Sequence, residues 1–209
     1  WLTRRLVEFS VTPNQITIAA TLLGLLGAAL LLVGTYFSQL IGALLLTASI
    51  IGDGCDGEVA RIKFMESEFG RKLDFFLDNV VNVAAIFSVG AGYAWQSGES
   101  FYFYASVVNG LAAAAAVLPV YSLFFREAKQ AVRLDLPAAR DPSRSWTAVD
   151  LIEGIAGRDF AYLILVLALF GRAHWFALAC LAGILVFLAA VVILVVRDRF
   201  GSSSSFPIR

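Results

Sequence analysis

Residues 9–52 read FSVTPNQITIAATLLGLLGAALLLVGTYFSQLIGALLLTASIIG and contain no charged side chain. A helix needs about 20 apolar residues to cross the roughly 30 Å hydrocarbon core of a bilayer. A stretch of 44 residues is therefore long enough for two crossings. The sequence Gly-Thr-Tyr-Phe-Ser at residues 34–38 is the expected place for the turn between them. The stretch thus predicts two membrane-spanning helices.

Further stretches without Asp, Glu, Lys or Arg cover residues 79–98, 100–125 and 173–196, and a shorter one covers residues 160–171. Together they predict six membrane spans, at about 14–34, 38–61, 70–95, 100–125, 155–171 and 174–196. Polar and apolar residues do not alternate in them, and lipid offers no water to unpaired backbone groups, so helices are expected. The predicted fold class is all-α: a six-helix membrane bundle that forms one domain over residues 1–200.

The composition excludes several classes of protein. Of 209 residues, 59% are hydrophobic and 15% are charged, against about 45–50% and about 25% in ordinary soluble domains. These values exclude a disordered chain, a nucleic-acid-binding domain and a typical soluble enzyme. The net charge is zero, so no overall field attracts an anionic partner. Cys55 and Cys180 lie far apart in the sequence and indicate neither a disulfide nor a Cys-based metal site.

The two ends of the chain predict little about function. Residues 1–10 mix apolar and charged side chains, which is typical of a short interfacial helix, and Pro13 is expected to end or bend it before the first span. Residues 201–209 are expected to form a disordered tail. Because the chain begins at Trp1 rather than Met, we expect an N-terminal region to precede it. Residues 126–157 form the one long polar stretch, and their role is not predicted.

The loop charges predict an orientation. Six spans place both termini on one side of the membrane, and 15 of the 16 Lys and Arg residues fall on that side. Only Arg172 falls on the other side. An excess of Lys and Arg marks the cytoplasmic side of membrane proteins. We therefore expect the termini, and any chemistry that needs charged groups, to be cytoplasmic.

Acidic residues gather at the end of the second predicted span and the start of the third. Residues 53–61 read DGCDGEVAR, and Asp74 and Asp78 follow. Residues 53, 56, 57 and 60 share one helix face, as do residues 70, 74, 78 and 82 of the next helix. Two adjacent helices are therefore expected to point four carboxylates toward each other, while small residues at 57, 60 and 70 leave space between them.

Four carboxylates near a membrane need compensating charge, because a charge in hydrocarbon costs at least a few kcal/mol and like charges repel. Carboxylate oxygens suit Mg²⁺, Mn²⁺ or Ca²⁺ better than zinc. The one histidine, His174, is expected on the opposite side. Two divalent ions about 3.5–4 Å apart would suit phosphate transfer. In the alternative interpretation the acids are structural and pair with the nearby bases, which are Arg61, Lys63, Arg71 and Lys72.

The motif residues fit the pattern D-x2-D-G-x2-A-R-x8-G-x3-D-x3-D over residues 53–78. This pattern resembles that of the CDP-alcohol phosphotransferases, also called the CDP-alcohol phosphatidyltransferase family. Members of that family have six spans with the motif across the second and third. Residues 11–17 are also similar to the entry to the family's first span. Asn79 departs from the pattern, because many relatives carry Arg or Lys there.

The resemblance implies an enzyme in which an acceptor hydroxyl attacks the phosphorus of a CDP-linked alcohol and CMP leaves. It implies two ions of Mg²⁺ or Mn²⁺ as cofactors and a homodimer in the bilayer, with no nucleic-acid partner. Asp78 would be the catalytic base. The implied metal ligands are Asp53, Asp56, Asp74 and Asp78. The implied donor-binding residues are Asp53, Asp56, Gly57, Ala60, Arg61, Gly70 and Asp74.

The acceptor site is less well defined by the sequence. Arg126 and Arg158 flank the expected mouth of the site and would suit a phosphate-bearing acceptor, although such residues commonly contact lipid head groups. Asn82 continues the face of Asp74 and Asp78, where an interhelical hydrogen bond is the other interpretation.

Three possible functions remain open from the sequence. A CDP-diacylglycerol donor, and hence phospholipid synthesis, is favoured slightly by its frequency in the family. A CDP-polyol donor of the CDP-inositol type is the alternative, because residues 57–78 also resemble that branch, in which a cytidylyltransferase domain can precede the membrane domain. A cation-coupled transporter is the rival from another class, but its acids would be spread across the membrane depth.

Overall fold

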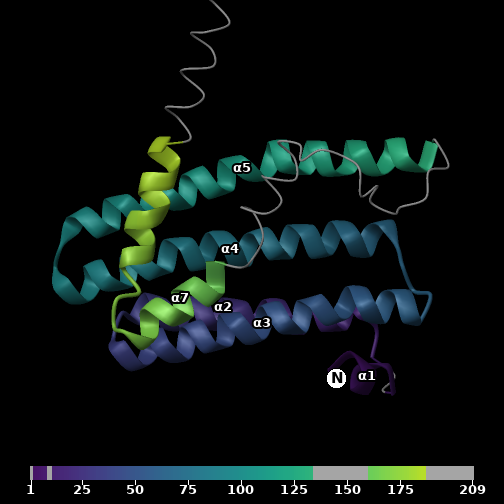
Figure 1. The fold of residues 1–209 in the computed structure, drawn as a ribbon, viewed down its shortest axis with the longest axis horizontal. Coiled ribbons are helices and arrows are strands. Elements are labelled where there is room, and N and C mark those ends of the chain that lie inside the picture. The colour runs from purple at the N-terminus through teal and green to yellow at the C-terminus, as the bar shows by residue number, and fades with distance from the viewer. Residues whose placement is uncertain (1, 9–10, 134–159, 187–209) are drawn as a thin grey trace, which may run out of the picture.

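The computed structural model describes residues 2–8, 11–133 and 160–186, and all regular structure in these ranges is α-helical. Figure 1 shows the arrangement of the helices. The helices are α1 (Leu2–Glu8), α2 (Pro13–Val33), α3 (Tyr36–Ile62), α4 (Glu68–Ser97), α5 (Ser100–Arg133) and α7 (Phe160–Leu169), followed by a helix over Trp175–Val186.

Four of these helices are long and apolar enough to cross a membrane: Pro13–Val33, Tyr36–Ile62, Glu68–Ser97 and the Ser100–Val117 part of α5. The two helices expected within residues 9–52 are therefore present. Phe160–Leu169 and Trp175–Val186 are apolar but shorter. The expected spans at 155–171 and 174–196 extend beyond the described residues, so the count of six stays a prediction.

The helix boundaries follow from local chemistry. Pro13 occupies the first turn of α2, where its missing N–H costs nothing, and the backbone N–H of Thr12 donates to Oε1 of Gln15 at 3.0 Å. Gly34 ends α2 with a left-handed φ of 80°, a conformation that glycine adopts without a steric penalty. Thr35 then caps α3 by accepting from the backbone N–H of Ser38 at 3.3 Å. The turn lies where the sequence predicted it.

Helix α2 is the common support of the bundle, because it is the main packing partner of both α3 and α4. Small residues let the backbones approach closely. A Cβ added to Gly27 would lie 2.8 Å from the carbonyl oxygen of Gly42, and one added to Gly42 would lie 2.7 Å from that of Gly27. One turn earlier on α2, a Cβ added to Gly24 would lie 2.7 Å from Val81 Cγ1 of α4 and 2.8 Å from Ser49 Oγ of α3. Glycines thus allow both α3 and α4 to approach the backbone of α2 closely.

Gly92 makes the closest of these approaches and carries a testable prediction. An added Cβ would lie 2.2 Å from the carbonyl oxygen of Leu31 and 3.0 Å from that of Leu32. We expect Gly92→Ala to lower the free energy of unfolding by about 1–3 kcal/mol, since the rigid backbone of α2 must shift. The measurement is thermal unfolding in detergent.

Gly110→Ala is the matched control. Gly110 is also a buried helical glycine, but its added Cβ would meet Phe87 Cβ at 3.6 Å, an ordinary contact. Its helix should gain about 0.5–1 kcal/mol from the loss of glycine. Equal stability of the Gly92 and Gly110 variants would contradict the close approach of α2 and α4.

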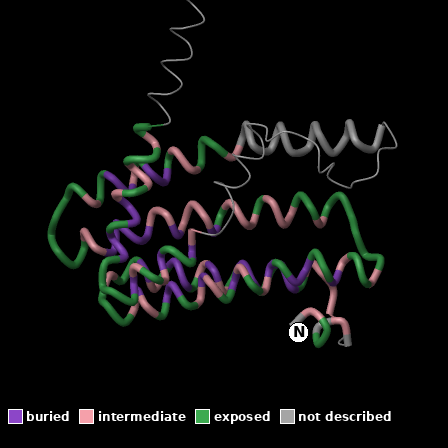
Figure 2. The backbone as a smooth tube through the Cα atoms, in the orientation of Figure 1, coloured by how far each residue is buried: buried purple, intermediate pink, exposed green. Residues whose placement is uncertain are grey.

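The hydrophobic core lies toward the end of the bundle where α2 ends and α3 begins, which we call the far end. Its buried residues are Leu31, Ala43, Leu46, Val81, Ala85, Val89, Ala161, Ile164, Ala168, Ala173 and Phe176. Figure 2 shows buried residues along the faces where helices meet. We call the opposite end, where α2 begins, α3 ends and α4 begins, the site end.

Two further expectations can be compared with the structure. A short N-terminal helix is present as α1, and it packs against α3. Helix α5 does not end near residue 125 but continues to Arg133, since residues 126–133 are mostly good helix formers. The expected disordered tail at 201–209 and residues 134–157 of the polar stretch lie outside the described residues.

Candidate active site

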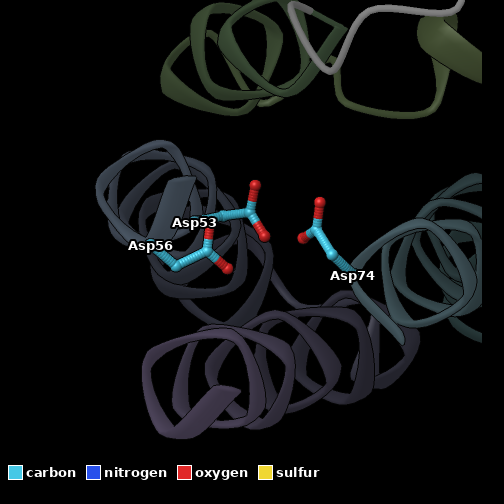
Figure 3. A group of neighbouring side chains, drawn as sticks. All are labelled: Asp53, Asp56 and Asp74. Carbon is cyan, nitrogen blue, oxygen red and sulfur yellow. The ribbon is translucent and has the colours of Figure 1, made fainter. Parts of the chain in front are cut away.

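Three of the acidic motif residues meet at the site end. Asp53 and Asp56 lie in the last three turns of α3, and Asp74 lies in the second turn of α4. One carboxylate oxygen of each lies within 4.8 Å of the other two. Figure 3 shows the side chains pointing toward one another from the two helices. Asp53 and Asp56 are buried, with 9% and 7% of their surfaces exposed.

This donor set fits a divalent cation. Hard cations such as Mg²⁺ and Ca²⁺ bind carboxylate oxygens at about 2.0–2.6 Å, so two oxygens that share one ion lie at most about 5 Å apart. The separations in the cluster, within 4.8 Å, meet that limit. Oxygen ligands alone are typical of sites for Mg²⁺, Mn²⁺ or Ca²⁺. The residues present therefore fit the metal that the motif implies.

Asp78 is placed differently from the other three. It lies one turn beyond Asp74 on α4, is half-buried, and does not belong to the group of three whose oxygens approach within 4.8 Å. A helix rises about 1.5 Å per residue. Asp78 and Asp53 therefore lie further from the site end, along α4 and α3, than Asp74 and Asp56 do. Asp78 therefore lies below the mouth of the site.

A cavity of about 210 Å³ opens between the helices at this end. Residues of α2, α3, α4 and the loop between α3 and α4 line it: Pro13, Asn14, Thr17, Asp56, Gly57, Ala60, Arg61, Met65, Glu66, Ser67, Gly70, Arg71 and Asp74. Six of the seven residues expected to bind the donor are among them, and the seventh, Asp53, belongs to the carboxylate cluster. The fixed positions of the motif thus surround one space.

Helix α2 explains why that space exists. The sequence predicted two neighbouring helices, but α3 and α4 each pack mainly on α2. Because each packs on α2 rather than closely on the other, their facing side chains leave room for a ligand. At the mouth, the backbone N–H of Gly70 donates to Oγ of Ser67 at 3.0 Å, which caps α4.

Gly57 keeps one wall of the cavity open. An added Cβ at Gly57 meets no atom within 4 Å, and the same holds for Gly54, which does not line the cavity. We expect Gly57→Leu to fold normally but to raise the KM for the donor by about 10–200-fold, the range for a change of pocket size. The measurement is a donor titration of CMP release together with thermal unfolding.

Gly54→Leu is the control, since it adds the same bulk to an exposed position of the same helix. It should leave the KM unchanged. If both variants raised the KM equally, or neither did, the cavity beside Gly57 would not be where the donor binds.

The structure adds residues that sequence reasoning missed. Thr17 of α2 is 4% exposed, lines the cavity, and its hydroxyl donates to Oδ2 of Asp56. Asn14 and Arg71 also line the cavity. Thr17 and Asn14 belong to residues 11–17, whose sequence was notable for its resemblance but assigned no role. Thr17 lies four residues after Pro13 and three after Asn14, so these residues share one helix face. That shared face is the one feature of the local sequence that relates Thr17 to Asn14.

Several basic residues bind acids outside the cluster. Arg61 Nε lies 3.7 Å from Oε1 of Glu66, and Lys72 Nζ lies 2.7 Å from Oε1 of Glu68. Glu66, expected to be a solvated loop acid, is exposed but lines the cavity. Both ion pairs are exposed to solvent, where such pairs contribute about 0–1 kcal/mol. Arg61 can therefore exchange Glu66 for a ligand at small cost.

Of the three acceptor candidates, only Asn82 has a side chain within the part of the chain that the structure describes. Asn82 is half-buried on α4, one turn beyond Asp78, and is not among the lining residues. The side chain of Arg126, on α5, and the whole of Arg158 lie outside the described residues. Their roles stay predictions.

Helices of membrane-spanning length thus end around a carboxylate cluster that fits a divalent cation, as expected for the family that the motif resembles. The sequence model of the CDP-alcohol phosphatidyltransferase family matches residues 10–137, more than half of the chain, and the chain belongs to that family. The family and the enzyme class predicted from the motif are thereby confirmed.

Curated relatives share the name "Bifunctional IPC transferase and DIPP synthase". The protein from Thermococcus kodakarensis is 36% identical over 159 residues, which are 72% of this chain and 34% of the relative. That from Aquifex aeolicus is 42% identical over 73 residues, 35% of this chain and 16% of the relative. That from Rubrobacter xylanophilus is 40% identical over 89 residues, which are 42% of this chain and 20% of the relative. The matches thus span about a third or less of each relative.

Proposed function

We propose that this domain transfers a substituted phosphate group from a CDP-polyol of the CDP-inositol type to an acceptor hydroxyl. The acceptor oxygen forms a bond to the phosphorus that carries the polyol, the bond from that phosphorus to the CMP oxygen breaks, and CMP leaves with the electron pair. The carrying observation is that Asp53, Asp56 and Asp74 converge beside a cavity lined by four other motif residues, which are Gly57, Ala60, Arg61 and Gly70.

Different residues of the chain bind the cation, the cytidine and the donor phosphates. Asp53, Asp56 and Asp74 hold the cation. Bound there, Mg²⁺ or Mn²⁺ supplies charge that offsets the diphosphate and improves CMP as a leaving group. Gly57 and Ala60 admit the cytidine, and the Arg61 guanidinium contacts a donor phosphate.

Asp78 acts as the general base. The hydroxyl proton of the acceptor passes to its carboxylate as the new phosphorus–oxygen bond forms. Its position deeper than the cavity mouth supports this role, since a donor that fills the outer space would leave the inner side to the acceptor. Asn82, one turn further, is the nearest candidate on the same helix face to contact that acceptor.

The relatives favour a polyol donor over the lipid donor that family frequency placed slightly ahead. The three relatives described above carry the name "Bifunctional IPC transferase and DIPP synthase", and residues 57–78 resemble the polyol branch. We therefore place CDP-inositol-type donors first and CDP-diacylglycerol second.

The arrangement in the membrane belongs to the same proposal. Six spans, of which four are long helices here, place the site end and both termini in the cytoplasm, following the distribution of Lys and Arg. A homodimer follows from the family resemblance. Reporter tags at the loop between α3 and α4 should be accessible only from the cytoplasmic side.

The test is a screen for release of radiolabelled CMP. Purified protein with Mg²⁺ or Mn²⁺ is incubated with CDP-inositol or CDP-diacylglycerol and a panel of alcohol acceptors. We expect acceptor-dependent CMP release from CDP-inositol. If only CDP-diacylglycerol were turned over, the polyol donor would be wrong and phospholipid synthesis would be the function. Ion flux in proteoliposomes without CMP release would show a transporter instead of an enzyme.

A further inference from the structure

Thr17 reaches the carboxylate cluster from a third helix. It lies on α2, whereas the acids lie on α3 and α4, and only 4% of its surface is exposed. Its hydroxyl lies within hydrogen-bond distance of two acceptors, Oδ2 of Asp56 and the carbonyl oxygen of Pro13, the latter at 3.2 Å. No motif position of the family pattern quoted above includes this residue.

A hydroxyl carries one proton, so it can donate fully to one acceptor at a time. A hydrogen bond to a carboxylate is roughly twice as strong as one to a neutral carbonyl. The hydroxyl of Thr17 therefore donates to the Asp56 carboxylate in preference to the Pro13 carbonyl.

Two other contacts make this hydrogen bond a fixed feature of the fold. On the inner side, Ser49 Oγ of α3 donates to the carbonyl oxygen of Ala20 on α2 at 2.7 Å. On the outer side, Lys63 Nζ donates to the carbonyl oxygen of Val11 at 2.9 Å. Both join the same two segments that Thr17 and Asp56 join. The register of α2 against α3 is thus held on both sides of the Thr17–Asp56 contact.

We propose that Thr17 is a positioning residue for the metal site, a role that rests on the proposed function. Its hydroxyl holds the Asp56 carboxylate in one orientation, so that Asp56 is placed to bind a cation together with Asp53 and Asp74. Partners that orient a metal ligand in this way typically raise metal affinity by about 10–100-fold.

The test measures Mn²⁺ affinity of the full chain in detergent by electron paramagnetic resonance, without donor or acceptor. Thr17→Val keeps the shape of the side chain but removes the donor, and should raise the Mn²⁺ dissociation constant by about 10–100-fold. Thr17→Ser restores the hydroxyl and should bring the constant back to within about threefold of the wild type. If Thr17→Val does not fold, Thr17→Ala replaces it.

Thr21→Val is the matched control. Thr21 lies one turn further on α2, is 7% exposed, and its hydroxyl donates only to a backbone oxygen, that of Thr17, at 2.8 Å. Its Mn²⁺ affinity should match the wild type. Wild-type affinity in Thr17→Val, an equal loss in Thr21→Val, or no recovery in Thr17→Ser would each overturn the proposal.

The design separates this inference from the proposed function. If no CDP-alcohol releases CMP but Mn²⁺ binding depends on Thr17 as described, the reaction is wrong and the positioning role stands. If CMP is released and Thr17→Val binds Mn²⁺ normally, the reaction stands and the positioning role is wrong.

Discussion

Asp78→Asn is expected to slow CMP release by about 10²–10⁴-fold, the usual contribution of a general base. Asparagine has nearly the same shape as aspartate but cannot accept the acceptor's proton. Because Asp78 lies outside the group of carboxylates that approach within 4.8 Å, Mn²⁺ affinity and donor binding should change little. The measurement is single-turnover CMP release at saturating donor, together with a Mn²⁺ titration.

Asn79→Ala is the control for this variant. Asn79 follows Asp78 on the same helix, but its amide donates to the carbonyl oxygen of Phe75 at 2.7 Å, within its own helix. It should turn over at close to the wild-type rate. Normal turnover in Asp78→Asn would remove Asp78 as the base, and a loss of Mn²⁺ affinity there would make it a metal ligand instead.

The motif could be placed from sequence because helical periodicity is local. Once residues 53–61 are helical, Asp56, Gly57 and Ala60 must share a face, and all three line the cavity. Asp53 joins Asp56 for the same reason. The fixed spacing across the loop then allowed Asp74 to be assigned to the same site. Neither step required knowledge of how the helices pack.

The contribution of α2 could not be predicted in this way. From Leu22 onward its side chains are apolar on all sides, so residues that face the core and residues that face lipid look alike in the sequence. Thr17 and Asp56 are 39 residues apart, and no short-range pattern connects them. Only the packing of α2 against both α3 and α4 shows that a threonine reaches the acids.

The length of α5 illustrates a related limit. Loss of apolar character near residue 125 predicted the end of a span, and the helix nevertheless continues to Arg133. Hydrophobicity reports where a helix leaves the lipid, whereas helix propensity decides where it ends. The end of the apolar span and the end of the helix coincide at Gly34, where a left-handed glycine ends α2. They lie apart in α5, where good helix formers follow the span.

Asp53→Asn is expected to have opposite effects on stability and on metal binding. Without a cation, two ionised carboxylates within 4.8 Å repel by on the order of 3 kcal/mol at an effective dielectric constant of 20. Removing one charge should therefore raise the unfolding temperature in EDTA. With Mn²⁺ present, the same change removes a charged ligand from a buried site, a loss of about 3–5 kcal/mol or roughly 10²–10⁴-fold in affinity.

This reversal of sign distinguishes a cation site from a set of structural acids. If the carboxylates were instead held by ion pairs with Lys or Arg, Asp53→Asn would leave a basic side chain without its partner. The variant would then lower stability in EDTA too, and not only with Mn²⁺. Thermal unfolding with EDTA and with Mn²⁺ therefore decides between the two interpretations. Glu68→Gln is the control, because Glu68 is exposed and pairs with Lys72, so neither measurement should change by more than about 1 kcal/mol. A stability loss in EDTA for Asp53→Asn would contradict the metal site.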